Sequence, residues 1–163
     1  GLQGMTGGSE VAPIGDPAGG PVGRYEVLEA MAVADCALDV EGESLDDLFE
    51  TAARAVAELM VDPATVSPSA EREVALTASS LDLLLYDWLS ELIFLKDSEQ
   101  MVFPETTVRV SGPSPARLGA RLRGAVIDPA RMTLRADPKA VTFHQFALAP
   151  HDGGWRARLV IDI

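Results

Sequence analysis

The fold of this protein is decided between Ser80 and Asp97, where the chain reads SLDLLLYDWLSELIFLKD. Apolar residues recur there at spacings of three and four, which is the period of an α-helix. The central stripe and the residues that widen it are Leu81, Leu84, Leu85, Trp88, Leu92 and Leu95, with Leu83, Tyr86, Leu89 and Ile93. Ser79 or Ser80 is a suitable N-cap residue for this helix. Because apolar residues cover most of its circumference, we expect this helix to lie deep, in contact with a sheet and its surroundings.

A half-buried strand is predicted from Ala34 to Val40, because apolar and polar residues alternate there. Asp35 and Asp39 take one face, and the opposite face carries Ala34, Cys36, Leu38 and Val40. Glu71 to Thr77 alternates in the same way and predicts a second strand.

A first helix lies between these strands. Ser44 and Asp47 supply a helix start, and Asp62-Pro63 ends the pattern. One apolar stripe follows the start at helical spacing: Leu45, Leu48, Phe49, Ala52, Val56, Leu59 and Met60.

The C-terminal half is predicted to consist of strands separated by turns rich in Gly, Pro and Asp. The predicted strands are Thr106–Ser111, Arg117–Val126, Met132–Arg135, Ala140–Leu148 and Trp155–Ile163. His151 to Gly154 closes a hairpin between the last two. The predicted class is α+β, with a mostly antiparallel β-sheet and two α-helices packed on it, covering one face.

The domain organisation follows from composition. Residues 1–23 hold eight glycines and three prolines without any period, so we expect a flexible tail. Residues 1–4 have the character of a cloning remnant. Residues 24–163 form a single predicted domain.

Composition and charge narrow the functional classes. The formal net charge is −12, and such a surface repels phosphate backbones, so we expect no direct nucleic-acid binding. A divalent cation or a basic protein partner is a better electrostatic match, although many acidic surfaces only maintain solubility. The sequence has no membrane-length apolar run and no secretory signal, and its single cysteine fits a reducing compartment. The expected localisation is cytoplasmic.

Common catalytic motifs are missing from the sequence, including the nucleophile elbow, the phosphate loop and the His-Glu-x-x-His motif. One cysteine and two histidines cannot build a structural zinc site. Cys36 lies among apolar strand residues and is interpreted as part of the core.

Carboxylates on strands are the remaining chemistry. Asp35 and Asp162 lie on the polar phases of their strands, and Ile163 adds a terminal carboxylate beside Asp162. If the strand ends meet, hard oxygen donors converge in a site suited to Ca²⁺, Mg²⁺ or Mn²⁺. The alternative is that both aspartates are only solvated.

The chain resembles the archease family along residues 25–163. The helix motif Leu84–Leu92 is followed by Asp97–Phe103, as in the family's Leu-Leu-Tyr-x-Trp-Leu-Ser-Glu-Leu, Asp-x-Glu and Val-Phe pattern. Further matching segments are Glu71–Val74, Phe49–Pro63, Lys139–Gln145 (the Lys-Ala-Val-Thr-Tyr-His signature) and Trp155–Ile163.

The resemblance implies an archease-like fold and a non-enzymatic role. Archeases activate the GTP-dependent RNA ligase of tRNA splicing and RNA repair, promoting its guanylylation and multiple turnover. By this resemblance, Asp35, Asp162 and Ile163 would ligate a divalent cation, usually calcium. Lys139 matches a lysine implicated in partner activation.

The chain departs from the family at two places. Met31 to Asp35 reads Met-Ala-Val-Ala-Asp where the family has Asp/Glu-His-Thr-Ala-Asp, and Met132 replaces the histidine of the Asp-Pro-x-Arg-His turn. Hydrogen bonds from neighbouring polar residues orient metal ligands, so the replacement of these polar residues by apolar ones predicts cation binding that is weak or absent.

Three hypotheses follow. The first is an archease-like activator of an RNA ligase. The second is a divergent binding module of the same fold with another protein partner. The third, a metal-dependent hydrolase using Asp35, Asp162 and His144, has no evident nucleophile and base. His144 is interpreted as a hydrogen-bonded structural residue, with Ala140, Thr142 and Phe146 on its face of the strand, and Val141 and Phe143 on the other.

Overall fold

The computed structural model describes residues 20–28 and 35–163, and for His144 and Gln145 it describes the backbone only. The predicted tail therefore lies almost wholly outside the described residues, as do Ala34 and the segment before Asp35. The strands are β1 Arg24–Val27, β2 Asp35–Gly42, β3 Ala70–Ala78, β4 Met101–Ser111, β5 Ala116–Val126, β6 Ala140–His151 and β7 Gly154–Asp162. The helices are α2 Leu45–Met60, the short 3₁₀ helix η2 Pro63–Thr65, and α3 Leu81–Glu99.

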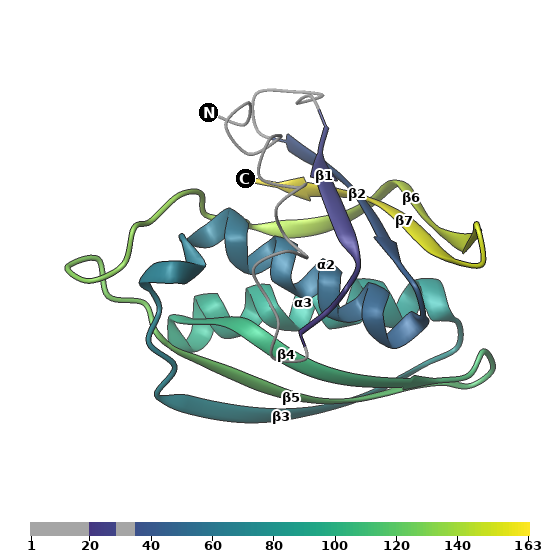
Figure 1. Cartoon of the computed structure of the whole chain (residues 1–163), viewed down its shortest axis with the longest axis horizontal. Coiled ribbons are helices and arrows are strands. Elements are labelled where there is room, and N and C mark those ends of the chain that lie inside the picture. Colours follow the sequence, from purple (N-terminus) through teal and green to yellow (C-terminus); the bar gives the residue numbers. More distant parts are fainter. Residues whose placement is uncertain (1–19, 29–34) are drawn as a thin grey trace.

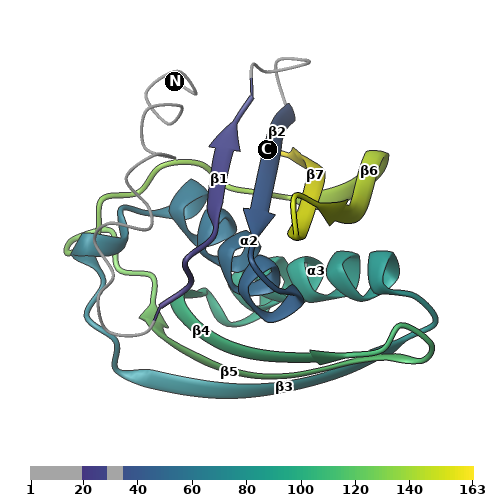
Figure 2. The same cartoon turned by 45° about the vertical axis from the view of Figure 1, so that its right-hand side comes forward.

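Two antiparallel sheets enclose the helices. One sheet has the strand order β1-β2-β7-β6 and the other has the order β3-β5-β4. Figures 1 and 2 show α2 and α3 lying between the two sheets. The predicted α+β class, with mostly antiparallel strands and two helices, is confirmed. The structure adds that the strands divide into two sheets, so the helices bury apolar surface on both sides.

The core forms where both helices meet the sheets. Phe49 of α2 and Trp88 of α3 are fully buried, and the Trp88 indole N–H donates to the Phe49 carbonyl oxygen at 3.1 Å. The inward face of β2 contributes Cys36, Leu38 and Val40, as the alternation predicted. The bond from Trp88 to Phe49 ties α3 to α2 and gives the buried indole N–H of Trp88 a hydrogen-bond partner.

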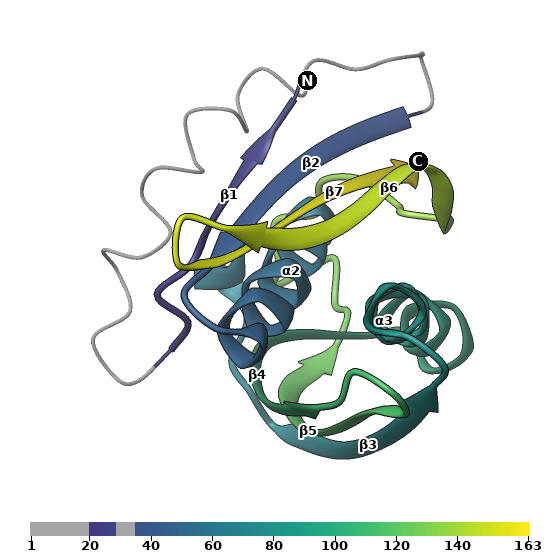
Figure 3. The same ribbon diagram turned by 90° about the vertical axis from the view of Figure 1, so that its right-hand side faces the viewer.

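Helix α3 is less enclosed than its sequence predicts. One side packs deeply, with Leu84, Leu85, Trp88 and Leu89 inaccessible to solvent. Leu83 and Phe94, however, are 38% and 59% exposed. Figure 3 shows α3 at one side of the helical layer, with α2 nearer the middle. A helix in that position cannot be covered all round.

The predicted strand Met132–Arg135 is wrong. This segment forms only an isolated bridge between Leu134 and Val61, and the Met132 side chain is buried in the core. Its amides bond outside any sheet: the Met132 N–H donates to the Asp128 carbonyl of the preceding turn at 2.8 Å, and the Arg135 N–H donates to the Met60 carbonyl at the end of α2 at 2.8 Å. The short strand β1, in contrast, has no prediction to match it.

The β6–β7 hairpin is confirmed, with Asp152 and Gly153 both at positive φ, 49° and 79°. Upstream, β6 is not regular. Thr142 pairs with Val160 and Ala147 with Arg158, so residues 143–146 oppose the single Leu159. This bulge places the rings of Phe143 and Phe146 5.2 Å apart, although simple alternation assigned them to opposite faces.

Asp47 anchors the start of α2 as well as the chain before β1. The Ser44 hydroxyl accepts from the Asp47 N–H at 3.0 Å, which confirms the predicted cap. The Asp47 carboxylate itself is buried and accepts from the Glu43 N–H at 2.8 Å. It also accepts from the amides of Val22 and Gly23 at 2.7 and 3.0 Å.

Substituting Asp47→Ala removes the acceptor of three backbone amides, so we expect the free energy of unfolding to fall by about 2–4 kcal/mol. Urea denaturation followed by circular dichroism measures this change. Asp47→Asn, which keeps a carbonyl oxygen, should recover part of the loss. A loss below about 0.5 kcal/mol for Asp47→Ala would show that these bonds contribute little.

Candidate functional site

Two predicted site residues, Asp35 and Asp162, meet at one end of the four-stranded sheet. Asp35, the first residue of β2, lies directly opposite Asp162, the last residue of β7. On its other side Asp162 lies opposite Ala140, the first residue of β6. Figures 1 and 3 show the C-terminal end of β7 beside the start of β2. Residues far apart in sequence thus form one row across three strands.

The two aspartates share the sheet face that points away from the helices. Directly opposite residues of an antiparallel pair project to the same side, with Cβ atoms about 4.5–5.5 Å apart. The neighbouring row on this face is Ala37, Val160 and Thr142, and both apolar members are buried. Asp35 and Asp162 are themselves half-buried. Two carboxylates placed in this way repel each other when both are charged.

Thr142 is a site residue that the sequence did not predict. It lies on the same face, diagonal to Asp162, and its buried hydroxyl oxygen has no hydrogen-bond partner among the described residues. Buried polar atoms are rarely left unsatisfied, and those that are can mark the place of a water molecule or an ion. The only sequence signal was that Thr142 follows Ala140 by two residues and so shares its strand face. That signal does not place Thr142 near Asp162 until the pairing of β6 with β7 is known.

The backbone of Lys139 contacts the strand end that carries Asp162. Its N–H donates to the Asp162 carbonyl oxygen at 2.7 Å, which fixes the residue next to the carboxylate row. The side chain is exposed and makes no ion pair with any residue in the described part of the chain. The ammonium group is therefore available to another molecule.

Lys96 of α3, which the sequence analysis missed, holds the segment that leads into Lys139. Its buried ammonium donates to Asp137 and, at 2.6 Å, to the Pro138 carbonyl oxygen. It also pairs with Asp97 at 2.7 Å. Burial lowers the pKa of Lys96, but the hydrogen bonds and charges of Asp137 and Asp97 outweigh it and raise the pKa overall. The sequence signal that could have identified Lys96 was its position on the buried side of an apolar helix.

The ligand atoms at this strand end are of the type that a hard divalent cation prefers, but they are fewer than its usual coordination number. Carboxylates, a hydroxyl and main-chain carbonyls are all oxygen ligands, and Ca²⁺ takes six to eight of them. Ile163, the third predicted ligand, is half-buried and follows Asp162 at the same strand end. Among the described residues, no three His, Cys, Asp or Glu side chains come together as a metal cluster. The predicted ligation by Asp35, Asp162 and Ile163 thus stays a prediction, with water completing the shell.

Two other predicted features have different outcomes. Cys36 is completely buried in β2, as expected of a core residue, and burial raises the pKa of its thiol to about 11. The side chain of His144 lies outside the described residues, so its structural role and its place in a hydrolase remain predictions. No helix in the described part of the chain is long and apolar enough to cross a bilayer.

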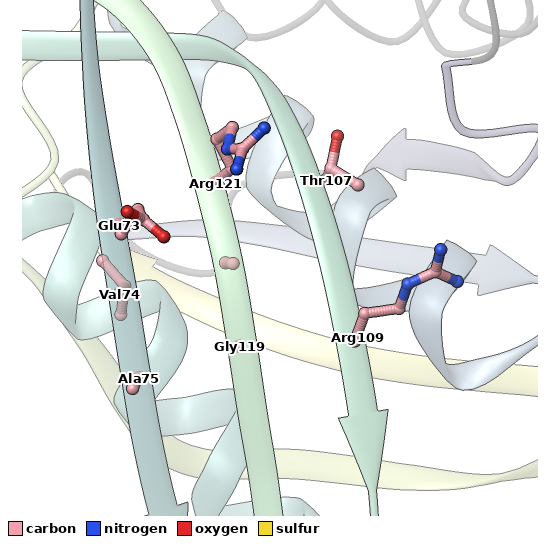
Figure 4. Close-up of a pocket in the computed structure, with 8 residues that line it drawn as sticks. Glu73, Val74, Ala75, Thr107, Arg109, Gly119 and Arg121 are labelled. Atoms are coloured by element: carbon pink, nitrogen blue, oxygen red, sulfur yellow. The ribbon is translucent and has the colours of Figure 1, made fainter.

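A shallow hollow lies on the outer face of the other sheet, far from this row. Figure 4 shows Glu73, Arg121, Thr107 and Arg109 around Gly119 on three adjacent strands. A side chain at Gly119 would meet nothing, so the hollow is open. The helical layer separates it from the carboxylate row (Figure 2). Exposed guanidinium groups without an enclosing wall bind anions only weakly.

The described residues thus form a small α+β protein in which a carboxylate pair and a lysine share one strand end of the four-stranded sheet. Residues 25–163 match the model of the Archease protein family. The protein archease of Methanosarcina mazei is 36% identical over 142 residues, which cover 86% of this chain and 96% of the relative. This chain belongs to the archease family.

Solved structures agree with this assignment. The solution structure of protein 1598 from Methanobacterium thermoautotrophicum is similar with a TM-score of 0.70 at 31% identity, covering 85% of this chain and 98% of that one. A crystal structure of an archease from Thermotoga maritima, described as a possible chaperone, gives a TM-score of 0.56 at 17% identity over 83% of this chain and 96% of that one. The second likeness shows the fold alone.

The buried Cys36 should be inert in the folded protein. Since the pKa of its thiol rises from 9.0 to about 11, the unfolded chain ionises first, and stability decreases as pH rises from 9 to 11. We expect a thiol-reactive disulfide reagent at pH 8 to label Cys36 only after urea unfolding. Rapid labelling of the native protein would contradict this assignment.

Substituting Lys96→Met should loosen the start of β6, because three bonds to its ammonium are lost. The amide of Lys139 is then expected to exchange with solvent at least about tenfold faster, a change of about 1.4 kcal/mol. Hydrogen exchange followed by NMR measures this rate. Arg72→Met, which removes an exposed pair with Glu99 and an exposed bond to the Glu71 carbonyl, is the control. Equal Lys139 exchange in both variants would contradict a role for Lys96 in positioning.

Proposed function

We propose that this protein is a non-catalytic activator of a GTP-dependent RNA ligase, promoting its guanylylation and its multiple turnover. Family membership supports the proposal. One observation carries it furthest: the register of β2, β7 and β6 brings Asp35, Asp162 and Lys139 to a single strand end. These are the residues that the resemblance assigns to cation binding and partner activation.

In this proposal the residues have distinct tasks. Asp35 and Asp162 hold a divalent cation, with the Thr142 hydroxyl able to orient one of its water molecules. The cation, when bound, supplies positive charge that offsets the repulsion of the carboxylates and attracts anionic groups of the partner's active centre. Lys139, fixed by its backbone and free at its ammonium, adds a second positive charge within reach of a phosphate.

The expected partner is a protein, and its expected chemistry is basic. An RNA ligase must bind phosphate backbones, so its surface carries Lys and Arg. The net charge of −12 on this chain complements such a surface and favours rapid encounter.

A divergent binding module with a different protein partner is the second candidate. It is favoured by the loss of the family's His-Thr pair before Asp35 and by the buried Met132 where the family has a histidine. The presence or absence of the ligase gene in the source genome separates the two candidates.

Activation tests the proposal directly. Wild-type protein added in catalytic amounts should raise ligase guanylylation and turnover, and Lys139→Ala should abolish the increase while retaining cation binding. Calorimetry with Ca²⁺ should give a dissociation constant on the order of 10⁻⁴–10⁻³ M, lost in Asp35→Asn and Asp162→Asn. Arg117→Ala, an exposed cation in the other sheet, is the matched control. The activator function is overturned if the wild type leaves guanylylation unchanged.

A further inference from the structure

An exposed apolar surface lies where α3 meets the bulge of β6, on the helix side of the strand that follows Lys139. It consists of Leu83, Tyr86 and Phe94 of α3 with Phe143 and Phe146 of β6, and we name it the aromatic ridge. Phe94 and Phe143 are 59% and 49% exposed. Large apolar side chains that are exposed singly are common, but the ring contacts among Tyr86, Phe143 and Phe146 gather three of them in one place, and such a group marks an interaction surface.

The helical part of the ridge runs along one face of α3. Leu83 and Tyr86 are three residues apart, and Leu83 and Phe94 are eleven apart, which is close to three full turns, with Asp87 and Ser90 between them on the same face. At 1.5 Å per residue this face is about 16 Å long. The length suits contact with two or three turns of another helix.

The strand part of the ridge is held in place by ring contacts. Phe143 stacks on Tyr86 with centroids 4.3 Å apart, and Phe146 lies edge-on to Tyr86 at 6.3 Å. The bulge opposite Leu159 lets both phenylalanines reach the same helix residue. A bulge that turns side chains toward a surface is a common feature of functional sites. The ridge is therefore a preformed surface that needs little ordering on binding.

The charges around the ridge are negative and unpaired. Asp82, Asp87 and Glu91 lie on α3, and none of them forms an ion pair or side-chain hydrogen bond with a described residue. Lys96, the basic residue of α3, is buried against Asp137 and Asp97 and offers no charge to the rim. An incoming surface thus meets apolar side chains bordered by free carboxylates.

We propose that the aromatic ridge is the docking surface for a basic amphipathic segment of the partner ligase, with apolar anchors flanked by Lys and Arg. This inference rests on the proposed function. A second copy of this chain would set acidic rim against acidic rim, and nucleic acid or an anionic membrane would be repelled by the same carboxylates. A basic protein segment is the occupant that satisfies both the apolar face and its border.

The position of the ridge separates docking from activation. Phe143 lies four residues after Lys139 on β6, about 13 Å along an extended strand. Because β6 is an edge strand, a partner seated on the ridge can extend past that edge toward Lys139, whereas the carboxylate row lies on the opposite face of the sheet. The ridge supplies affinity, whereas Lys139 supplies the activating charge.

The experiment compares binding with activation in the full chain. Leu83→Ser with Phe94→Ser, both at exposed positions, should weaken ligase binding at least tenfold by biolayer interferometry, and saturating protein should restore activation. Asp87→Lys with Glu91→Lys should weaken binding and reduce its dependence on salt. Val22→Ser, 54% exposed beside the opposite edge strand, and Glu73→Lys are the matched controls. Lys139→Ala should bind normally and fail to activate.

Each outcome decides a different point. If the ridge variants bind the ligase as tightly as wild type, the docking inference fails while the activator function stands. If wild type neither binds nor activates the ligase, both fail together. Light scattering that finds a wild-type dimer dispersed by Leu83→Ser with Phe94→Ser would assign the ridge to self-association and overturn the inference.

Discussion

The antiparallel pairing of β2 with β7 is the constraint on which both the core and the site depend. Eight consecutive residues are in register, from Asp35 opposite Asp162 to Gly42 opposite Trp155. Because side chains alternate along a strand, a slip of one residue in either strand would exchange its faces. Cys36 and Leu38 would leave the core, and Asp35 would turn toward the helices. Burial of the inner face thus fixes the carboxylates on the outer face.

Much of the fold could be predicted because local rules and tertiary packing agree. The helix starts at Ser44 and Ser80 are real caps, and both helix patterns correspond to observed helices. The division into two sheets could not be predicted, since alternation shows which face is buried but not which strands pair. The predicted strand Met132–Arg135 is wrong because the amides of this segment bond to the preceding turn, to Thr65 and to the end of α2 instead of to a strand. The β6 bulge also broke the expected alternation.

The candidate site likewise contains residues that the sequence predicted and residues that it did not. Asp35 and Asp162 were predicted from their phase on the strands and Lys139 through a family resemblance, and the register brings them together although their ligand and partner roles are untested. Thr142 and Lys96 were not predicted. The place of Thr142 depends on register across two strands, and that of Lys96 on a loop from a distant part of the chain. Such residues become visible only when long-range contacts are known.

The central claim is that one strand end of the four-stranded sheet holds the cation-binding and activating residues together. NMR titration of the labelled protein with Ca²⁺ tests it most directly. The account predicts that the amides of Asp35, Lys139, Thr142 and Asp162 shift along a single saturation curve, while those around Gly119 in the other sheet stay unchanged. Shifts that gather elsewhere, or a spectrum unaffected by millimolar Ca²⁺, would contradict it.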